Sequence, residues 1–391
     1  MLLALTAYMV CLPAQTFDGT SRTPAKLVFT QEVGSDENDV FILRPGQERE
    51  RIFLGGTMPQ WSPNGRYLAI LANVGVWLYD ERSRRAKEII GFKASGFPTD
   101  YGWSPDGRYI LYTHATGSDR PDYRLYAYDL ATGKSRQLTR GGGNWSWDKA
   151  GRRMLVTTIY TGRRWDDFER GEGSEPSDVV MLDANLHLIR RVTRDAWNEA
   201  ASWLPHNEVL LEHAGSEPAD GAGHPTHFYV QNLTTGKRRH LNLPWDVEGY
   251  WKAVSPDGRT LAATADGHGQ ILYLADLATG RSKIVAKDIY PSQLAWSRDG
   301  RHLFFERTSP HPKQMYADSE QVFKLDVRTG KVEQISHQPE MYSFFGYDNS
   351  RGTVMFQDRG IIYQADGQGV VALGKPAGIA IGDIAAWWPR R

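Results

Sequence analysis

A short turn motif recurs along this chain and constrains its fold more than any other feature. Residues 103–108 read Trp-Ser-Pro-Asp-Gly-Arg and are followed by the apolar run 109–112. Proline presets φ, the aspartate side chain bonds its own backbone, and glycine accepts a positive φ, so the motif is typical of a tight turn between two strands. Close copies begin at Trp61, Val254 and Trp296. One such hairpin would mean little, but a periodic set indicates a repeat fold.

The first residue of the motif serves as a register mark for the repeat. The marks are Trp61, Trp103, Trp147, Trp203, Val254, Trp296, Tyr347 and Trp387. They lie roughly 40 to 56 residues apart, and several copies of the motif are decayed. After each mark comes a second apolar strand, then a third strand that often ends in an Asp-x-x-Thr-Gly turn, as at 129–133, and then a fourth. Four strands per repeat of this length predict the blades of a β-propeller.

The two ends of the chain complement each other. Residues 27–30, 39–43 and 51–54 read as second, third and fourth strands with no first strand before them, whereas residues 381–388 read as a first strand. We expect the C-terminal strand to complete the first blade and so to remove an open sheet edge. The sequence therefore predicts an all-β, eight-bladed β-propeller of four-stranded antiparallel blades. Seven blades is the alternative, if one decayed repeat is an insertion.

The hairpins and the Tyr-x-x-Asp-x-x-Thr-Gly strands that follow them resemble the WD-like propeller repeats of the TolB family. Similar repeats form the propellers of dipeptidyl-peptidase-type and tricorn-type proteases. The resemblance covers nearly everything from about residue 27 onward and implies the fold, but these motifs specify no chemistry. No α/β N-terminal domain precedes the repeats, as it would in TolB. No α/β-hydrolase domain or Gly-x-Ser-x-Gly elbow is present either, which argues against a peptidase.

Composition and the first residues bear on partners and location. Lys plus Arg equals Asp plus Glu at 46 each, so the charge balance gives no reason to expect nucleic acid as a partner. Cys11 is the only cysteine, which excludes an intrachain disulfide. Residues 1–14 are an apolar stretch of signal-peptide length, too short to span a membrane as a helix, although they lack a basic n-region. We expect a periplasmic or secreted protein, with residues 1–25 as signal peptide and leader and 26–391 as one propeller domain.

A lipid anchor on Cys11 is disfavoured because Val10 stands where a small residue is required. Elsewhere no run is long enough to cross a membrane, so no transmembrane segment is expected.

We expect the ligand-binding side chains to lie on the long loops. In a propeller, loops joining second to third and fourth to first strands share one face, and loops on a rigid scaffold commonly carry function. The loop 160–177 mixes aromatic and charged side chains, which can stack on a sugar or peptide and hold a carboxylate. With two tryptophans from fourth-to-first loops, it predicts the binding residues Tyr160, Arg163, Arg164, Trp165, Trp197 and Trp245. The competing interpretation is a solvated loop folded on its own aromatic side chains.

A second long loop carries residue types that bind metals. His213, His224 and His227 are weak candidates, with His224 and His227 spaced as a ligand pair. The loop is rich in glycine and proline and lacks a frame that fixes ligand geometry, so exposed histidines are the favoured interpretation and no metal or other cofactor is predicted. Asp166 and Glu169 could serve acid–base chemistry, but acidic pairs occur on most loops, and no catalytic residue is assigned.

The remaining motif residues are predicted to be structural, including the turn aspartates Asp106, Asp257 and Asp299. The sequence therefore favours a non-enzymatic binding or scaffolding propeller, TolB-like, that recognises a protein, peptide or glycan on its loop-rich face. The alternative is a carbohydrate-active hydrolase or lyase on a propeller scaffold, which would need histidine and acidic side chains to converge in one pocket. The ligand and the oligomeric state are not determined by the sequence.

Overall fold

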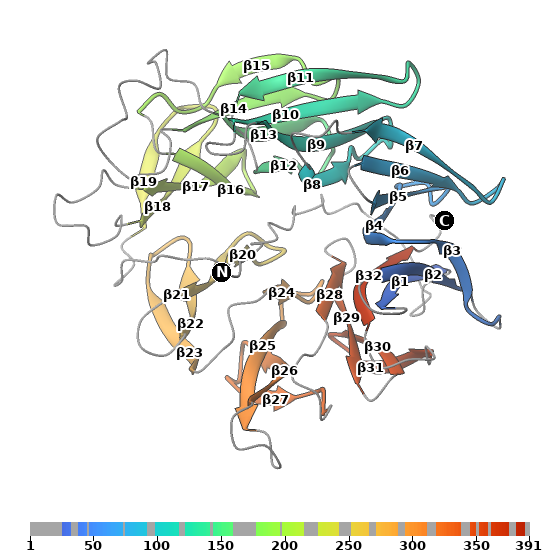
Figure 1. Ribbon diagram of the computed structural model, residues 1–391. Coiled ribbons are helices and arrows are strands. Elements are labelled where there is room, and N and C mark those ends of the chain that lie inside the picture. Colours follow the sequence, from blue (N-terminus) through green and yellow to red (C-terminus); the bar gives the residue numbers. More distant parts are fainter. Residues whose placement is uncertain are drawn as a thin grey trace. The chain divides into compact units, whose positions relative to one another are not determined.

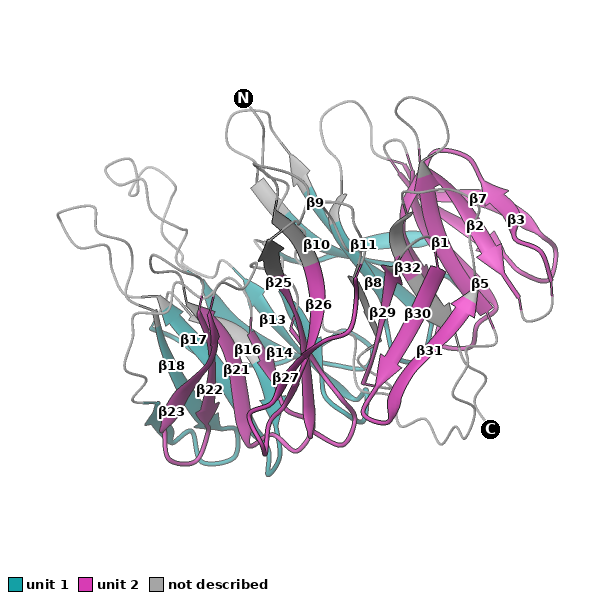
Figure 2. Cartoon of the chain, turned by 90° about the horizontal axis from the view of Figure 1, so that it is seen from below, with its two compact units in different colours: residues 1–15, 92–248 teal, residues 16–91, 249–391 magenta. Residues whose placement is uncertain are grey.

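The computed structural model describes residues 26–32, 38–44, 47–72, 75–91, 98–116, 122–140, 144–158, 177–195, 198–214, 226–241, 252–265, 271–287, 294–310, 318–337, 345–348, 352–358, 361–374 and 381–387. These residues form 32 β-strands and no helix (Figure 1). The strands make eight four-stranded sheets and fall into two compact units (Figure 2). Each unit is described separately below.

The first unit holds three sheets, drawn in teal in Figure 2. In each of them the strand order follows the chain. The first sheet contains β8 (Pro98–Trp103), β9 (Tyr109–Thr116), β10 (Asp122–Asp129) and β11 (Lys134–Arg140). The second contains β12 (Trp145–Trp147), β13 (Arg153–Thr158), β14 (Asp178–Asp183) and β15 (Leu188–Arg191). The third contains β16 (Asn198–Leu204), β17 (Glu208–Ala214), β18 (Thr226–Asn232) and β19 (Arg238–His240).

The second unit holds five sheets, drawn in magenta in Figure 2. Four of them follow the chain order. Their strands are β4 (Gly56–Trp61), β5 (Tyr67–Ala72), β6 (Gly75–Asp80), β7 (Arg85–Gly91), β20 (Lys252–Val254), β21 (Thr260–Ala265), β22 (Ile271–Asp276), β23 (Ser282–Lys287), β24 (Ala295–Trp296), β25 (His302–Pro310), β26 (Asp318–Asp326), β27 (Val332–Gln334), β28 (Phe345–Asp348), β29 (Thr353–Asp358), β30 (Ile361–Asp366) and β31 (Gly369–Gly374). The fifth contains β1 (Lys26–Glu32), β2 (Asn38–Leu43), β3 (Glu50–Phe53) and β32 (Ile381–Trp387).

The fifth sheet joins strands from the two ends of the described chain. Its order is β3-β2-β1-β32, and β32 pairs antiparallel with β1, with Lys26 opposite Trp387 and Gln31 opposite Ile381. The C-terminal strand therefore completes the first blade, as predicted. Eight four-stranded antiparallel blades make this an eight-bladed β-propeller fold, which confirms the predicted fold class and excludes the seven-bladed alternative.

The recurring turn motif connects first and second strands, and its polar side chains explain why. The Ser104 hydroxyl donates to Asp106 Oδ1 at 2.6 Å and accepts the Tyr109 N–H at 2.8 Å. The Arg108 N–H donates to the same aspartate oxygen at 3.0 Å, and Gly107 takes φ 73°. The same serine–aspartate bond, at 2.6 and 2.7 Å, recurs at Asp257 and Asp299. These aspartates hold turns, as predicted.

Neighbouring sheets within each unit pack face to face through apolar side chains. In the first unit, Leu111 of β9 and Leu125 of β10 share a buried cluster with Trp145 of β12 and Leu182 of β14. Among the register residues, Trp61, Trp103, Trp147 and Trp296 are all buried. The indole N–H of Trp296 donates to the Ala253 carbonyl at 3.0 Å, so this ring also links adjacent blades.

Three predictions stay open. The structure confirms the propeller repeats, but the narrower TolB-like family stays a prediction. So does the assignment of residues 26–391 to one domain. Residues 1–25, with Cys11, lie outside the described residues, and the signal peptide therefore stays a prediction. Within the described ranges, the search for a helix long and apolar enough to cross a membrane finds none.

Candidate functional site

The residues predicted to bind a ligand are not among those that the structure describes. The predicted set is Tyr160, Arg163, Arg164, Trp165, Trp197 and Trp245. His224 and the acidic pair Asp166 and Glu169 also lie outside the described residues. Their roles stay predictions.

Two of the three weak metal candidates are described, and they lie opposite each other. His213 of β17 pairs in register with His227 of β18. Burial lowers the pKa of His213; Asp195 opposes this effect, whereas the guanidinium of Arg238 adds to it. The imidazole of His213 is therefore neutral near pH 7. Among the residues with described positions, no group of three or more histidine, cysteine or acidic side chains could hold a metal ion.

The carboxylate near His213 is engaged in an ion pair. Asp195 pairs with Arg238 of β19, and the guanidinium of Arg238 also donates to Gln231 Oε1 at 2.9 Å. The same guanidinium lies 4.7 Å from the centre of the Tyr229 ring. Burial raises the pKa of Tyr229, so this phenol stays protonated. These contacts tie the segment after β15 to the third sheet of the unit, a structural role.

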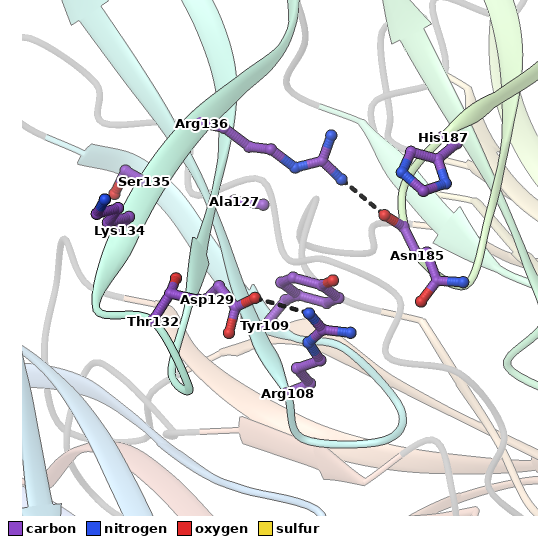
Figure 3. A pocket seen from close by; sticks show the side chains of 10 residues that line it. All are labelled: Arg108, Tyr109, Ala127, Asp129, Thr132, Lys134, Ser135, Arg136, Asn185 and His187. Carbon is purple, nitrogen blue, oxygen red and sulfur yellow. Dashed lines mark hydrogen bonds and ion pairs between the residues drawn. The ribbon is translucent and has the colours of Figure 1, made fainter.

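A groove in the first unit, between the β8–β11 sheet and the β12–β15 sheet, was not foreseen from the sequence. It consists of two adjoining hollows, of about 300 and about 480 Å³, which share Arg136 and His187; we call it the β11 groove. The smaller hollow is polar, and Arg108, Asp129 and Lys134 also line it (Figure 3). Half of the residues that line the larger hollow are apolar and half are polar. Its apolar lining consists of Leu138, Val180, Leu182, Leu186 and Leu188.

One wall of the groove is the edge strand β11. Side chains two residues apart in a regular strand point to the same face, so Lys134 and Arg136 share a face. Leu138 has no partner in β10 because the register shifts there in a β-bulge, and its side chain extends the same row. Leu138 packs against the cluster shared with the β12–β15 sheet, which shows that this row faces that sheet. The row therefore changes from cationic to apolar along the strand.

The other wall is the turn between β14 and β15. Asp183 Oδ1 accepts the N–H groups of Asn185 and His187 at 2.9 and 2.8 Å. Leu186 takes φ 63°, a left-handed conformation that glycine normally occupies, yet its side chain is only 2% exposed. In the corresponding turn after β10, the residue with positive φ is Gly133, four residues after Asp129. Leu186 is only three residues after Asp183, so the β14–β15 turn is one residue shorter. Burial of the Leu186 side chain offsets the cost of its backbone conformation.

The polar hollow carries positive charge that protein carboxylates do not neutralise. Arg108 is paired with Asp129 at 2.9 Å, and His187 Nδ1 lies 3.5 Å from Asp183. Arg136 instead donates to the carbonyl of Asn185 at 2.6 Å (Figure 3) and to that of Leu186 at 3.3 Å. In the part of the chain that the structure describes, no carboxylate pairs with Arg136 or Lys134. The hollow is therefore suited to an anionic group.

A buried carboxyl group lies on β8, the first strand of the same unit. Asp100 of β8 is 4% exposed, and its Oδ2 atom has no hydrogen-bond partner among the described residues. Burial holds the pKa of Asp100 well above its usual range, although the Tyr101 N–H opposes this effect. Strong pKa perturbation of this kind is common at functional sites. The sequence offered no signal for it, because burial depends on how the sheets pack.

Comparison with known proteins finds similarity to peptidases. No family model matches the chain. Dipeptidyl-peptidase 5 of Porphyromonas gingivalis is 22% identical over 317 residues, which cover 74% of this chain and 42% of that protein. Dipeptidyl aminopeptidase BIII of Pseudoxanthomonas mexicana is 24% identical over 244 residues, which cover 59% and 33% respectively. The chain thus spans less than half the length of these curated relatives.

Solved structures share the fold. An oligogalacturonate lyase from Vibrio parahaemolyticus matches with a TM-score of 0.51 at 16% identity, covering 88% of this chain and 98% of that one. The propeller domain of the Trilobed protease from Pyrococcus furiosus matches with a TM-score of 0.51 at 14% identity, covering 83% and 99%. An acylaminoacyl peptidase from Pyrococcus horikoshii matches with a TM-score of 0.51 at 15% identity, covering 82% and 52%. At these identities the likeness is one of fold.

The relatives overturn the prediction of a non-enzymatic binding or scaffolding role. Both curated relatives are peptidases, and their match to this chain contradicts a purely non-enzymatic prediction. The prediction was wrong because the repeat motifs specify only turn geometry and cannot separate a propeller that serves an enzyme from one that does not. The missing nucleophile elbow was also weak support, since it says nothing about catalytic groups outside these motifs.

Proposed function

We propose that the protein works in peptide hydrolysis, as the propeller of a hydrolase similar to dipeptidyl peptidases. The observation that carries this proposal is the match to Dipeptidyl-peptidase 5 along 317 residues, 74% of the chain. A match of that extent follows the repeats through most of the propeller and is not confined to one motif. We assign substrate holding to the blades, and no catalytic residue to the described ranges.

Activity of the native protein tests this function. The gene is tagged in its own genome, the protein is purified from native cells, and release of 4-nitroaniline from a panel of dipeptidyl-4-nitroanilides is measured. We expect dipeptide release that elutes together with the tagged chain in size-exclusion chromatography and disappears when the gene is deleted. Oligogalacturonides are assayed in parallel, because oligogalacturonate lyases share the fold. Absence of peptide cleavage, or cleavage of oligogalacturonides alone, would refute the proposal.

We further propose that the protein is exported and acts outside the cytoplasm on peptides. The apolar stretch 1–14 supports this location. N-terminal sequencing of the chain from fractionated cells should find a mature end beyond residue 14 in the periplasmic or secreted fraction. An intact Met1 in the cytoplasmic fraction would contradict export.

A further inference from the structure

The wall of the β11 groove is an edge strand. In the order β11-β10-β9-β8, β11 lies at one end, so within the described residues only β10 pairs with it. Its outer row of backbone N–H and C=O groups can pair with an added strand, as sheet edges do when they bind extended peptides. The groove therefore offers main-chain hydrogen bonding as well as side-chain contacts.

Charge selects one kind of ligand at the polar end. Lys134 and Arg136 point to the same face of β11 and lack a carboxylate partner among the residues described above. A carboxylate that enters the hollow would form charge-assisted hydrogen bonds with both cations. Lys134 is exposed and free to move toward it.

The leucines of the larger hollow favour a ligand with an apolar side chain at a fixed distance from its acidic side chain. Leu138 follows Arg136 by two residues, and Leu188, 56% exposed, lies across the groove from it. Alternate side chains of a strand are about 6.8 Å apart. The β-bulge at Leu138 bends β11, and the Leu138 side chain still lies on the face that Arg136 shares with Ala127. An acidic side chain opposite Arg136 therefore places the side chain two residues away beside the leucines.

We propose that the β11 groove binds an extended peptide that carries an acidic side chain and, two residues away, an apolar one. The peptide adds a strand to the edge of β11, with its carboxylate between Lys134 and Arg136 and its apolar side chain against Leu138 and Leu188. Binding at this groove does not require the protein to cleave peptides, so it stands apart from the proposed function.

Fluorescence polarisation with a blocked peptide tests the groove. The probe is fluorescein-Ser-Thr-Glu-Thr-Leu-Ser-amide, which has no free terminus for an exopeptidase. We expect Kd to rise about tenfold for Lys134→Glu and about tenfold for Leu188→Asp. Replacing glutamate by glutamine in the probe should weaken binding to the unchanged protein by a similar factor. This arm needs no protein variant and so cannot fail through misfolding.

The chain offers matched controls. Arg85 lies opposite Asp80 in strand register at the start of β7, as Lys134 lies opposite Asp129 at the start of β11, and Arg85 lines neither hollow of the β11 groove. Arg85→Glu therefore makes the same charge change in another blade and should leave Kd unchanged. Ile284 of β23 is 50% exposed, so Ile284→Asp is the matched control for Leu188→Asp and should leave Kd unchanged.

Hydrogen exchange separates strand addition from loose charge attraction. The bound probe should slow amide exchange in residues 134–139 and leave β7 unchanged. Equal Kd for Lys134→Glu and the wild-type protein, equal weakening by Arg85→Glu, or binding without protection of β11 would each overturn the proposal. Binding without any peptidase activity would refute the proposed function and leave the groove standing.

Discussion

The buried carboxyl group of Asp100 should make the stability of the protein depend on pH in a way that one substitution removes. Asp100 and Gly102 lie two residues apart in β8 and face the same side of the sheet. The partner of Gly102 in β9 is Leu111, which is buried against the β12–β15 sheet. The carboxyl group therefore lies at the packed interface of two sheets, and its Oδ2 atom has no described partner. Asp100→Asn keeps the size and removes the titration.

The sign and size of the effect follow from proton linkage. The pKa of Asp100 is raised in the folded protein, whereas in the unfolded chain an aspartate titrates near about 3.9. Above the unfolded pKa the folded state binds more protons, so the free energy of unfolding falls as pH rises toward the folded pKa. One proton gives a slope of about 1.4 kcal/mol per pH unit. The stabilisation is complete below the unfolded pKa and is lost through this window.

Urea denaturation from about pH 4 to about pH 8 measures this slope. The difference in unfolding free energy between Asp100→Asn and the wild-type protein should rise by about 1.4 kcal/mol per pH unit in the lower part of that range, in favour of the variant. Glu48→Gln, at an exposed position, is the control and should show no such slope. A flat difference for Asp100→Asn would refute the argument, because it would mean that the carboxyl group ionises in the folded protein as it does in the unfolded chain.

Two further stability predictions concern the turns. Ser104→Ala removes a hydrogen bond to Asp106 and one from the Tyr109 N–H, and should lower the free energy of unfolding by about 2 to 4 kcal/mol in urea. Ser83 is exposed and bonds Asp80 through its backbone N–H, so Ser83→Ala should change the free energy of unfolding by less than about 0.5 kcal/mol. Leu186→Gly relieves about 1 kcal/mol of backbone strain but loses about 3 kcal/mol of apolar burial. It should therefore destabilise the protein by about 2 kcal/mol in the same assay, and a stabilised variant would show that strain outweighs burial.

The β11 groove shows why the sequence could not predict the candidate site. Its walls, at 134–138 and 185–188, are some 50 residues apart in the chain, as the bond from Arg136 to Asn185 records. Basic residues at the start of an outer strand also occur elsewhere, for example Arg85, where they protect a sheet edge. Only the packing of two sheets distinguishes Lys134 from Arg85.

The sequence by itself determined the architecture of this protein. Proline, aspartate and glycine at fixed offsets set the intact copies of the turn, the period predicts eight or seven blades, and the complementary ends predict the shared sheet, because each of these depends on local geometry. Tertiary structure alone decided which polar groups are buried, such as Asp100, and which blade edges open into a groove. Those features depend on how one sheet lies against the next, and no local pattern encodes the distance between residues that only folding brings together.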